Sequence, residues 1–209
     1  MAMLRFAIVM VLALVCRNGV AQEEFPFKAL VFQGASAFRP GESVEYFLVK
    51  RGFLRGVSPD EEAAMIARWT REHPNARLVP VSVLGERSPL PMVYAWPVDG
   101  DDNLNLLLVR QGVYPALVML DTPEFEQLLE RSKHTRYAKR LAAQERAGNP
   151  TGILSRRLVS APRYDDFMKK LVAAETAAQA DMIGIWSDRF KPVRDKMGLT
   201  PLATLGLTE

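Results

Sequence analysis

The spacing of hydrophobic and polar residues predicts strands in the first part of the chain. Two short apolar runs, at 27–32 and 43–49, flank an Arg-Pro-Gly-Glu turn at 39–42 and predict a β-hairpin. Apolar and polar residues alternate over 77–84, which predicts a further strand. Because a proline cannot donate to a sheet ladder, Pro80 is expected at an edge or a bulge of that strand.

A helix is predicted between these strands, because its start and its end both carry sequence signals. The Ser-Pro-Asp-Glu run at 58–61 supplies a capping serine, a proline suited to the first helical position and a glutamate for a capping box. Met65, Ile66 and Trp69 fall on one face of this helix, which we expect to be buried. The helix is predicted to end before the His-Pro pair at 73–74.

Three further elements are predicted in the middle of the chain. Residues 92–96 form an apolar strand that turns at the Asp-Gly pair 99–100. Residues 104–111 form a second helix, and Gly112 stands where a left-handed residue often ends a helix. An extended apolar piece at 114–120 is expected to follow.

The last predicted helix carries an apolar stripe that faces the core. The stripe consists of Tyr164, Phe167, Met168, Leu171, Val172, Ala178 and Met182. Spacings of three and four residues place these side chains on one helix face, and Glu175 falls on the same face. Strands, a helix, more strands and then helices follow one another along the chain, which predicts an α+β fold built on a five-stranded barrel with appended helices.

Residues 121 to about 160 are predicted to form a helical insertion before the last helix. The insertion opens with Asp-Thr-Pro-Glu at 121–124, which we interpret as a helix cap because an apolar stripe follows it. The barrel domain, with this insertion, is expected to cover residues 22–190, and residues 191–209 are expected to form a C-terminal tail.

Residues 1–21 have the pattern of a secretory signal peptide. A short basic start is followed by an apolar run at 6–16 and by a small-x-small cleavage site at 19–21. The apolar run is about half as long as the ~20 residues that span a bilayer, so no permanent membrane helix is expected. Lipidation of Cys16 is the alternative, but Val15 stands where a small residue is expected. We therefore expect an exported protein, periplasmic or extracellular.

Export changes the chemistry that is available to the mature chain. Cleavage removes Cys16, the only cysteine, so neither a disulfide nor a thiol nucleophile is expected. Cleavage also removes the positive charges of Arg5 and Arg17 from a chain whose formal net charge is +3. This loss weakens any bulk attraction to nucleic acid. The two histidines, His73 and His134, are too few for a multi-histidine metal site.

Two stretches of the chain resemble the thermonuclease, or staphylococcal nuclease-like, family. The first is Leu-Val-Arg-Gln-Gly at 108–112, and the second is Ala-Glu at 174–175 running on to Gly-Ile-Trp-Ser at 184–187. In that family both are scaffold motifs of an OB-fold barrel with its C-terminal helix. The resemblance therefore implies a staphylococcal nuclease-like OB fold for this chain.

The resemblance also implies structural roles for particular residues. Arg110 is expected to pair with Asp181 on the C-terminal helix, Gly112 to follow the helix that carries Arg110, and Trp186 to cover the bottom of the barrel. Glu175 is expected to accept hydrogen bonds from loop backbone, which would offset its place on an apolar face.

The catalytic residues of the family lie upstream, and this chain has other residues at the matching positions. Gln-Gly-Ala-Ser at 33–36 corresponds to the calcium-binding Asp-Gly-Asp-Thr of the family. Glu45, Lys50 and Phe53 correspond to a catalytic arginine, a calcium-binding aspartate and the general base. The second catalytic arginine falls at Pro91.

No catalytic residue is assigned, but three side chains remain as candidates. Arg87 is the nearest alternative for the second arginine, and Glu42 and Glu45 are the carboxylates of a possible relocated acidic site. Because this hydrolysis needs a hard cation held by carboxylates and guanidinium groups on the developing charge, we expect no calcium-dependent nuclease activity. No cofactor or metal is expected, and calcium enters only if a rearranged site is active.

Lys50, Arg51 and Arg55 place positive charge at the mouth of the expected barrel and are candidates for anion or nucleic-acid binding. The sequence favours a binding or protein-interaction module. Two alternatives stay open: a binder of single-stranded nucleic acid or another polyanion, and an active secreted nuclease that hydrolyses DNA or RNA. The expected partner is accordingly a protein or a nucleic acid.

Overall fold

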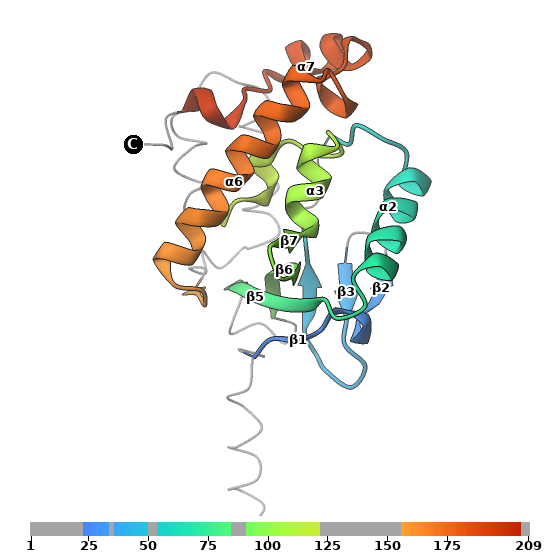
Figure 1. Ribbon diagram of the computed structural model, residues 1–209, viewed down its shortest axis with the longest axis vertical. Coiled ribbons are helices and arrows are strands. Elements are labelled where there is room, and N and C mark those ends of the chain that lie inside the picture. The colour runs from blue at the N-terminus through green and yellow to red at the C-terminus, as the bar shows by residue number, and fades with distance from the viewer. Residues whose placement is uncertain (1–22, 34–35, 50–53, 85–90, 122–155, 206–209) are drawn as a thin grey trace, which may run out of the picture.

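Short and long strands curl into one partly open sheet, and helices pack around it to give an α+β fold (Figure 1). This computed structural model describes residues 23–33, 36–49, 54–84, 91–121 and 156–205. The strands are β1 (Phe25–Pro26), β2 (Val31–Gln33), β3 (Ser36–Phe38), β4 (Glu45–Phe47), β5 (Arg77–Leu84), β6 (Met92–Asp99), β7 (Asp102–Asn103) and β8 (Arg156–Arg157). The long helices are α2 (Pro59–Glu72) and α6 (Ala161–Ala180), and the shorter α3 (Leu104–Arg110) lies between them (Figure 1).

The order of the strands explains why the sheet curls. Along the sheet the order is β1-β5-β6-β4-β3-β2, and all of these neighbours are antiparallel except β4 and β6, which are parallel. The two outermost strands, β1 and β2, belong to one segment of chain and are separated by the short 3-10 helix η1 (Phe27–Ala29). The same segment therefore pairs with β5 at one end of the order and with β3 at the other.

The N-terminal hairpin differs from the sequence prediction. Residues 27–32 were predicted as one strand, but η1 occupies the first half of the run and β2 only its end. The turn at 39–42 joins β3 to β4, not 27–32 to 43–49. The physical reason is a change of environment within the run, because Phe27 is buried whereas Val31 and Phe32 are exposed.

A second prediction that was wrong concerns residues 114–120. An extended piece was expected, but Ala116–Met119 form the 3-10 helix η2, all of whose residues are buried. A continuous apolar run shows no periodicity that separates a buried helical turn from a buried strand. Pro115, in the β region at the start of η2, sets the direction of the turn.

Several predicted elements are confirmed. Helix α2 begins with the complete Ser58–Glu61 capping box. The bulge predicted at Pro80 lies between Pro80 and Ser82 of β5. Gly112 follows α3 with a φ of +61°, in the left-handed region. The buried face of α6 includes Glu175, but Met182, which was predicted to continue the apolar stripe, is 47% exposed.

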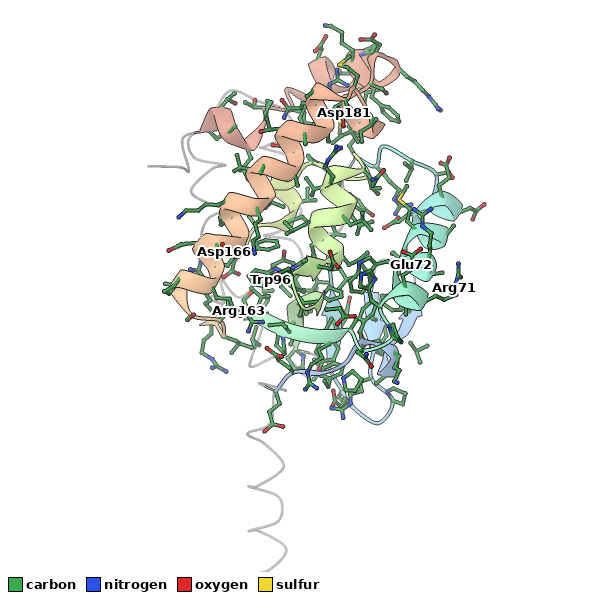
Figure 2. The ribbon with its side chains drawn as sticks, in the orientation of Figure 1. Arg71, Glu72, Trp96, Arg163, Asp166 and Asp181 are labelled. Atoms are coloured by element: carbon green, nitrogen blue, oxygen red, sulfur yellow. The ribbon has the colours of Figure 1, made fainter. Side chains whose placement is uncertain are left out.

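Aromatic rings join the sheet to α6. Trp96 of β6 stacks on Phe167 of α6, with ring centroids 4.0 Å apart, and lies between the sheet and the helix (Figure 2). Tyr164 stacks on the same indole at 6.0 Å. Stacked aromatic pairs contribute about 0.5–1.5 kcal/mol each beyond their buried area, so this contact fixes α6 on the sheet.

The stretch expected as a C-terminal tail forms part of the packed body. It contains α7 (Lys191–Met197) and the 3-10 helix η5 (Leu202–Leu205), and Leu202 is fully buried in the main core. The packing therefore continues to Leu205. No helix within the described residues is long and apolar enough to cross a membrane.

The predicted insertion lies largely outside the described residues, but the structure shows how its two ends are held. Asp121 Oδ2 lies 3.2 Å from Arg157 Nε, and the Asp121 backbone N–H donates to Tyr164 Oη at 2.8 Å. The Arg157 guanidinium lies 4.0 Å above the Tyr164 ring. Chain that leaves the core at Asp121 thus returns beside it at Arg157.

Replacing Ser58 by Ala is expected to destabilise the protein by about 1 kcal/mol, because the Glu61 backbone N–H loses its side-chain acceptor at the start of α2. Urea unfolding of the mature chain measures this cost. Ser43→Ala is the matched control, since Ser43 is exposed in the loop before β4, and its effect should stay within about 0.5 kcal/mol. Equal effects of the two substitutions would contradict a stabilising role for the cap.

Candidate functional site

Glu42, one of the candidate carboxylates, belongs to a hydrogen-bonded turn. Its Oε1 accepts from Arg39 Nη1 at 2.7 Å, and its Oε2 accepts from Tyr46 Oη at 2.9 Å. Burial of Tyr46, and then its hydrogen bond to Glu42, raise the pKa of the Tyr46 hydroxyl, which stays a neutral donor. Both carboxylate oxygens of Glu42 therefore have protein donors, and Glu42 serves to hold the turn between β3 and β4.

Glu45, the second candidate carboxylate, lies on the opposite face of β4 from Tyr46, because successive side chains of a strand point to opposite faces. It pairs with Phe38 of β3 and Met92 of β6 and is 5% exposed. Glu42 is bonded to Tyr46, so Glu42 and Glu45 do not converge. Among the described residues there is no group of three or more His, Cys, Asp or Glu that could hold a metal ion.

Only one member of the candidate anion cluster, Arg55, lies among the described residues. Lys50 and Arg51 lie outside the described residues, as does Arg87. Arg55 is described, and its Nε lies 2.8 Å from Glu62 Oε2 on α2. The positive charge of Arg55 therefore lies against an internal carboxylate, and its assignment to ligand binding stays a prediction.

Tyr114 completes a small polar cluster with Arg55 and Glu62. Its hydroxyl donates to Glu62 Oε1 at 2.7 Å and accepts from Arg55 Nε at 3.3 Å. Burial, and then the neighbouring Glu62 carboxylate, raise the pKa of the Tyr114 hydroxyl. The cluster joins α2 to the segment that follows α3. No local sequence pattern indicates it, because its members are far apart in the chain.

Three glycines form a backbone junction between distant segments. The Gly56 N–H donates to Val113 O at 2.8 Å, and the Ile185 N–H donates to Gly112 O at the same distance. A Cβ at Gly56 or at Gly184 would overlap the Gly112 carbonyl oxygen, and a Cβ at Gly112 would overlap the Ile183 carbonyl. Only residues without side chains permit this approach of the three backbones.

Gly112 and Gly184 were part of the sequence motifs, but Gly56 was not identified. Gly112 and Gly184 both have a positive φ, at +61° and +56°, so the backbone conformation itself favours glycine there. At Gly56 the requirement comes only from the approach of Gly112 and Ile185. Contacts between distant segments leave no local pattern, which is why sequence reasoning missed this residue.

The ion pair expected from the resemblance is present beside the junction. Arg110 Nη2 lies 2.6 Å from Asp181 Oδ2, and the two side chains are 41% and 52% exposed. Because water screens such a pair, it contributes at most about 1 kcal/mol. Because the pair joins the ends of α3 and α6, it orients these two helices more than it stabilises the fold.

Glu175 accepts backbone hydrogen bonds, as its place on an apolar face required. Its Oε1 accepts from the Ala116 N–H at 2.8 Å, and its Oε2 accepts from the Leu202 N–H at 2.6 Å. Burial raises the pKa of the Glu175 carboxyl to about 7, against the lowering effect of the two N–H donors. The side chain thus connects α6 to the segment after α3 and to the C-terminal segment.

Trp186, which was expected to cover the bottom of the barrel, is 6% exposed. It packs with Ala178 and Ile185 in a small cluster separate from the main core. The Arg194 guanidinium lies 5.6 Å from the centre of its ring, and Arg194 Nη1 also donates to Ser187 O at 2.7 Å. Trp186 therefore anchors α7 and the residues before it.

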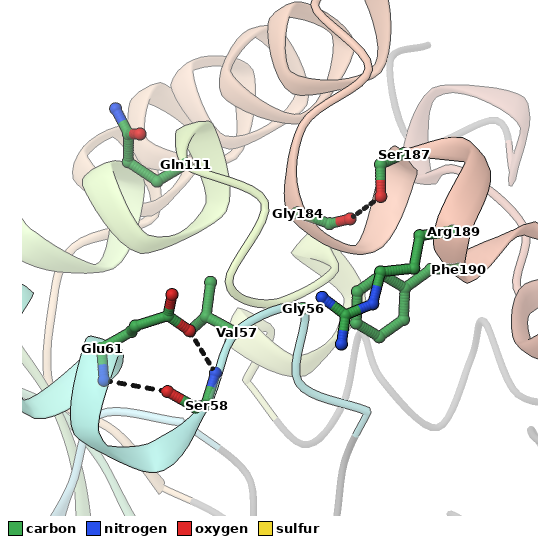
Figure 3. Close-up of a pocket in the computed structure, with 9 residues that line it drawn as sticks. All are labelled: Gly56, Val57, Ser58, Glu61, Gln111, Gly184, Ser187, Arg189 and Phe190. Carbon is green, nitrogen blue, oxygen red and sulfur yellow. Dashed lines mark hydrogen bonds between the residues drawn. The ribbon is translucent and has the colours of Figure 1, made fainter.

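A shallow hollow of about 440 Å³ lies next to the glycine junction (Figure 3). Ser58 and Glu61 of the α2 cap form one wall, and Arg189 and Phe190 stand opposite. The hydrogen bonds with Ser58, and then the charge of Arg189, lower the pKa of Glu61. Since Glu61 is an ionised part of the cap, this wall presents negative charge at the start of α2.

No known protein family, characterised protein or solved structure that we compared with this chain gives a match.

Replacing Gly184 by Ala is expected to cost about 3–5 kcal/mol, because a left-handed φ and an overlap with Gly112 backbone act together. Thermal and urea unfolding of the mature chain measure the loss. Gly100→Ala is the matched control, since Gly100 has a similar φ of +58° but open space around it. It should cost only about 1–2 kcal/mol, and equal losses would show that the close approach carries no energy.

Proposed function

We propose that this protein is an exported binding module built on an OB-fold barrel of the staphylococcal nuclease-like type, without calcium-dependent nuclease activity. The strand order supports the OB-fold assignment. The meander β2-β3-β4, the parallel pair of β4 with β6 and the helix α2 between β4 and β5 are compatible with a five-stranded Greek-key barrel. The predicted signal peptide at residues 1–21 supports export.

The observation that carries the proposal is the contrast between the frame and the candidate catalytic residues. The contacts of Gly112 and Gly184, of Arg110 with Asp181 and of Glu175 with loop backbone are all present. The two candidate carboxylates, by contrast, are separated, because Glu42 holds the turn before β4 and Glu45 lies on the face of β4 opposite Tyr46, to which Glu42 is bonded. A calcium ion needs six to eight oxygen ligands in one place, so separated carboxylates do not provide a site.

A protein partner is favoured over a nucleic acid by the charges and the exposed side chains. Arg55 is neutralised by Glu62, which removes one cation from the expected anion-binding face. Val31 and Phe32 are 53% and 37% exposed on β2, the last strand in the order. An apolar end strand is suited to an extended segment of a protein, which adds to a sheet through main-chain hydrogen bonds.

The assay that tests the proposal incubates the mature protein with single-stranded and double-stranded DNA, with calcium and with a calcium chelator. We expect no cleavage in either condition, because the described carboxylates do not form one metal site. Calcium-dependent cleavage that the chelator abolishes would overturn the proposal of a non-catalytic module. A staphylococcal-type nuclease assayed in parallel shows that the conditions permit cleavage.

Retention of labelled single-stranded DNA, measured at several salt concentrations, separates the two kinds of partner. We expect no retention at physiological salt. Retention that falls steeply with salt, and that Lys50→Ala with Arg51→Ala abolishes, would overturn the protein-partner assignment and support polyanion binding. Lys170→Ala is the matched control, since Lys170 lies on α6 and pairs with Asp166 at 2.9 Å.

A further inference from the structure

His73, which directly follows α2, faces a hydrogen-bond acceptor with each of its two ring nitrogens. Nδ1 lies 2.8 Å from Trp69 O, and Nε2 lies 3.3 Å from Asp102 Oδ2 on β7. A neutral imidazole has one N–H and can donate to only one of these oxygens, whereas the imidazolium form donates to both. The geometry around His73 therefore fits the charged form.

Other features of the surroundings also favour the imidazolium form. The His73 ring stacks on the indole of Trp69, with centroids 4.4 Å apart, and the face of an indole attracts a cation. His73 stands at the C-terminal end of α2, where the helix dipole favours positive charge. Among the described residues, the charged groups that act on the ring are Asp99, at the end of β6, and Asp102. Burial lowers the pKa of His73, but the hydrogen bond to Trp69 O and the two carboxylates outweigh burial and raise it.

Helix α2 is held at its two ends by different kinds of contact. Two of its residues are buried, Glu62 near the start and Trp69 near the end. At the start, the glycine junction and the hydrogen bond of Glu62 connect α2 to the segment after α3. At the end, His73 connects α2 to Asp102, which precedes Asn103, the residue whose side chain caps α3. The two helices run in opposite directions, so each end of α2 is joined to an end of α3 (Figure 1).

We propose that His73 is a pH-sensitive clasp between α2 and the start of α3: the imidazolium form holds the end of α2 against β7, and loss of the proton releases Asp102. The remaining N–H stays on Nδ1, because Trp69 O is the closer acceptor and the Asp102 side chain, which is 73% exposed, can bind water instead. Nε2 then turns a lone pair toward the carboxylate, which repels it. The clasp is independent of the proposed binding function, since neither β2 nor β4 contributes a residue to it.

The direction of the pH dependence follows from linkage. The closed clasp raises the pKa of His73 above its ordinary value of 6.5, so closing takes up a proton. The clasp is therefore fully favoured below pH 6.5 and is lost as the pH rises through the raised pKa. Glu175, whose pKa is also raised, contacts η2 and η5, so its titration acts on segments other than α2.

A proton NMR titration of the full mature chain tests the clasp at His73 itself. The chain has two histidines, so the His134→Gln variant leaves one imidazole signal to follow. We expect its pKa to lie above 6.5 and to fall when Asp102 is replaced by Asn. Asp101→Asn is the matched control, since it removes the same charge from the exposed neighbouring residue, and it should leave the pKa nearly unchanged. A pKa at or below 6.5, or equal shifts in the two variants, would overturn the proposal.

Hydrogen exchange at pH 5 and pH 8.5, corrected for intrinsic exchange rates, tests the release. We expect protection of residues 69–73 and 102–106 to fall about two- to fivefold at the higher pH. Protection of residues 62–65, at the start of α2, should stay unchanged, which separates local release from global unfolding. His73→Gln keeps a side-chain donor but cannot titrate, so it should abolish the difference. Equal protection at the two pH values, or a difference that persists in this variant, would contradict the clasp.

Discussion

The fold depends on one contact between backbones, the approach of Gly112 to Gly56 and Gly184. Gly112 follows α3, Gly184 follows α6, and Gly56 precedes α2, so a single point joins the three helices that surround the sheet. Two backbone hydrogen bonds cross it, from the Gly56 N–H to Val113 O and from the Ile185 N–H to Gly112 O. Because no side chain separates the segments, their backbones are in direct contact, which limits how the three helices can be placed.

Buried carboxylates also join distant segments elsewhere in the molecule. Glu62 connects α2 to Tyr114, Glu175 connects α6 to η2 and η5, and Asp121 connects the end of the core segment to Arg157. In each case the acid lies on one element and its donors on another. Since a buried acid without donors is costly, these side chains specify which segments must meet, beyond what apolar packing requires.

Local structure could be predicted from the sequence, whereas contacts between distant segments could be predicted only where the resemblance implied them, as for Arg110 with Asp181. The Ser58 cap, the bulge at Pro80 and the left-handed Gly112 each depend on a few adjacent residues, and each was foreseen. The apolar runs at 27–32 and 114–120 were misassigned, because their conformation depends on neighbours far away in the chain. For the same reason the pairing of Arg55 with Glu62 was not predicted.

The scaffold contacts and the candidate catalytic residues are subject to different physical constraints. The presence of the scaffold contacts therefore does not imply a catalytic site. Gly112, Gly184 and Glu175 contact backbone atoms, so their roles hold whatever side chains occupy the strand ends. A catalytic site instead requires particular side chains to converge on one point. Glu42 is committed to a turn, and Glu45 lies on the opposite face of β4 from its neighbour Tyr46. A curled sheet of this kind can therefore keep its architecture whatever side chains stand at its strand ends.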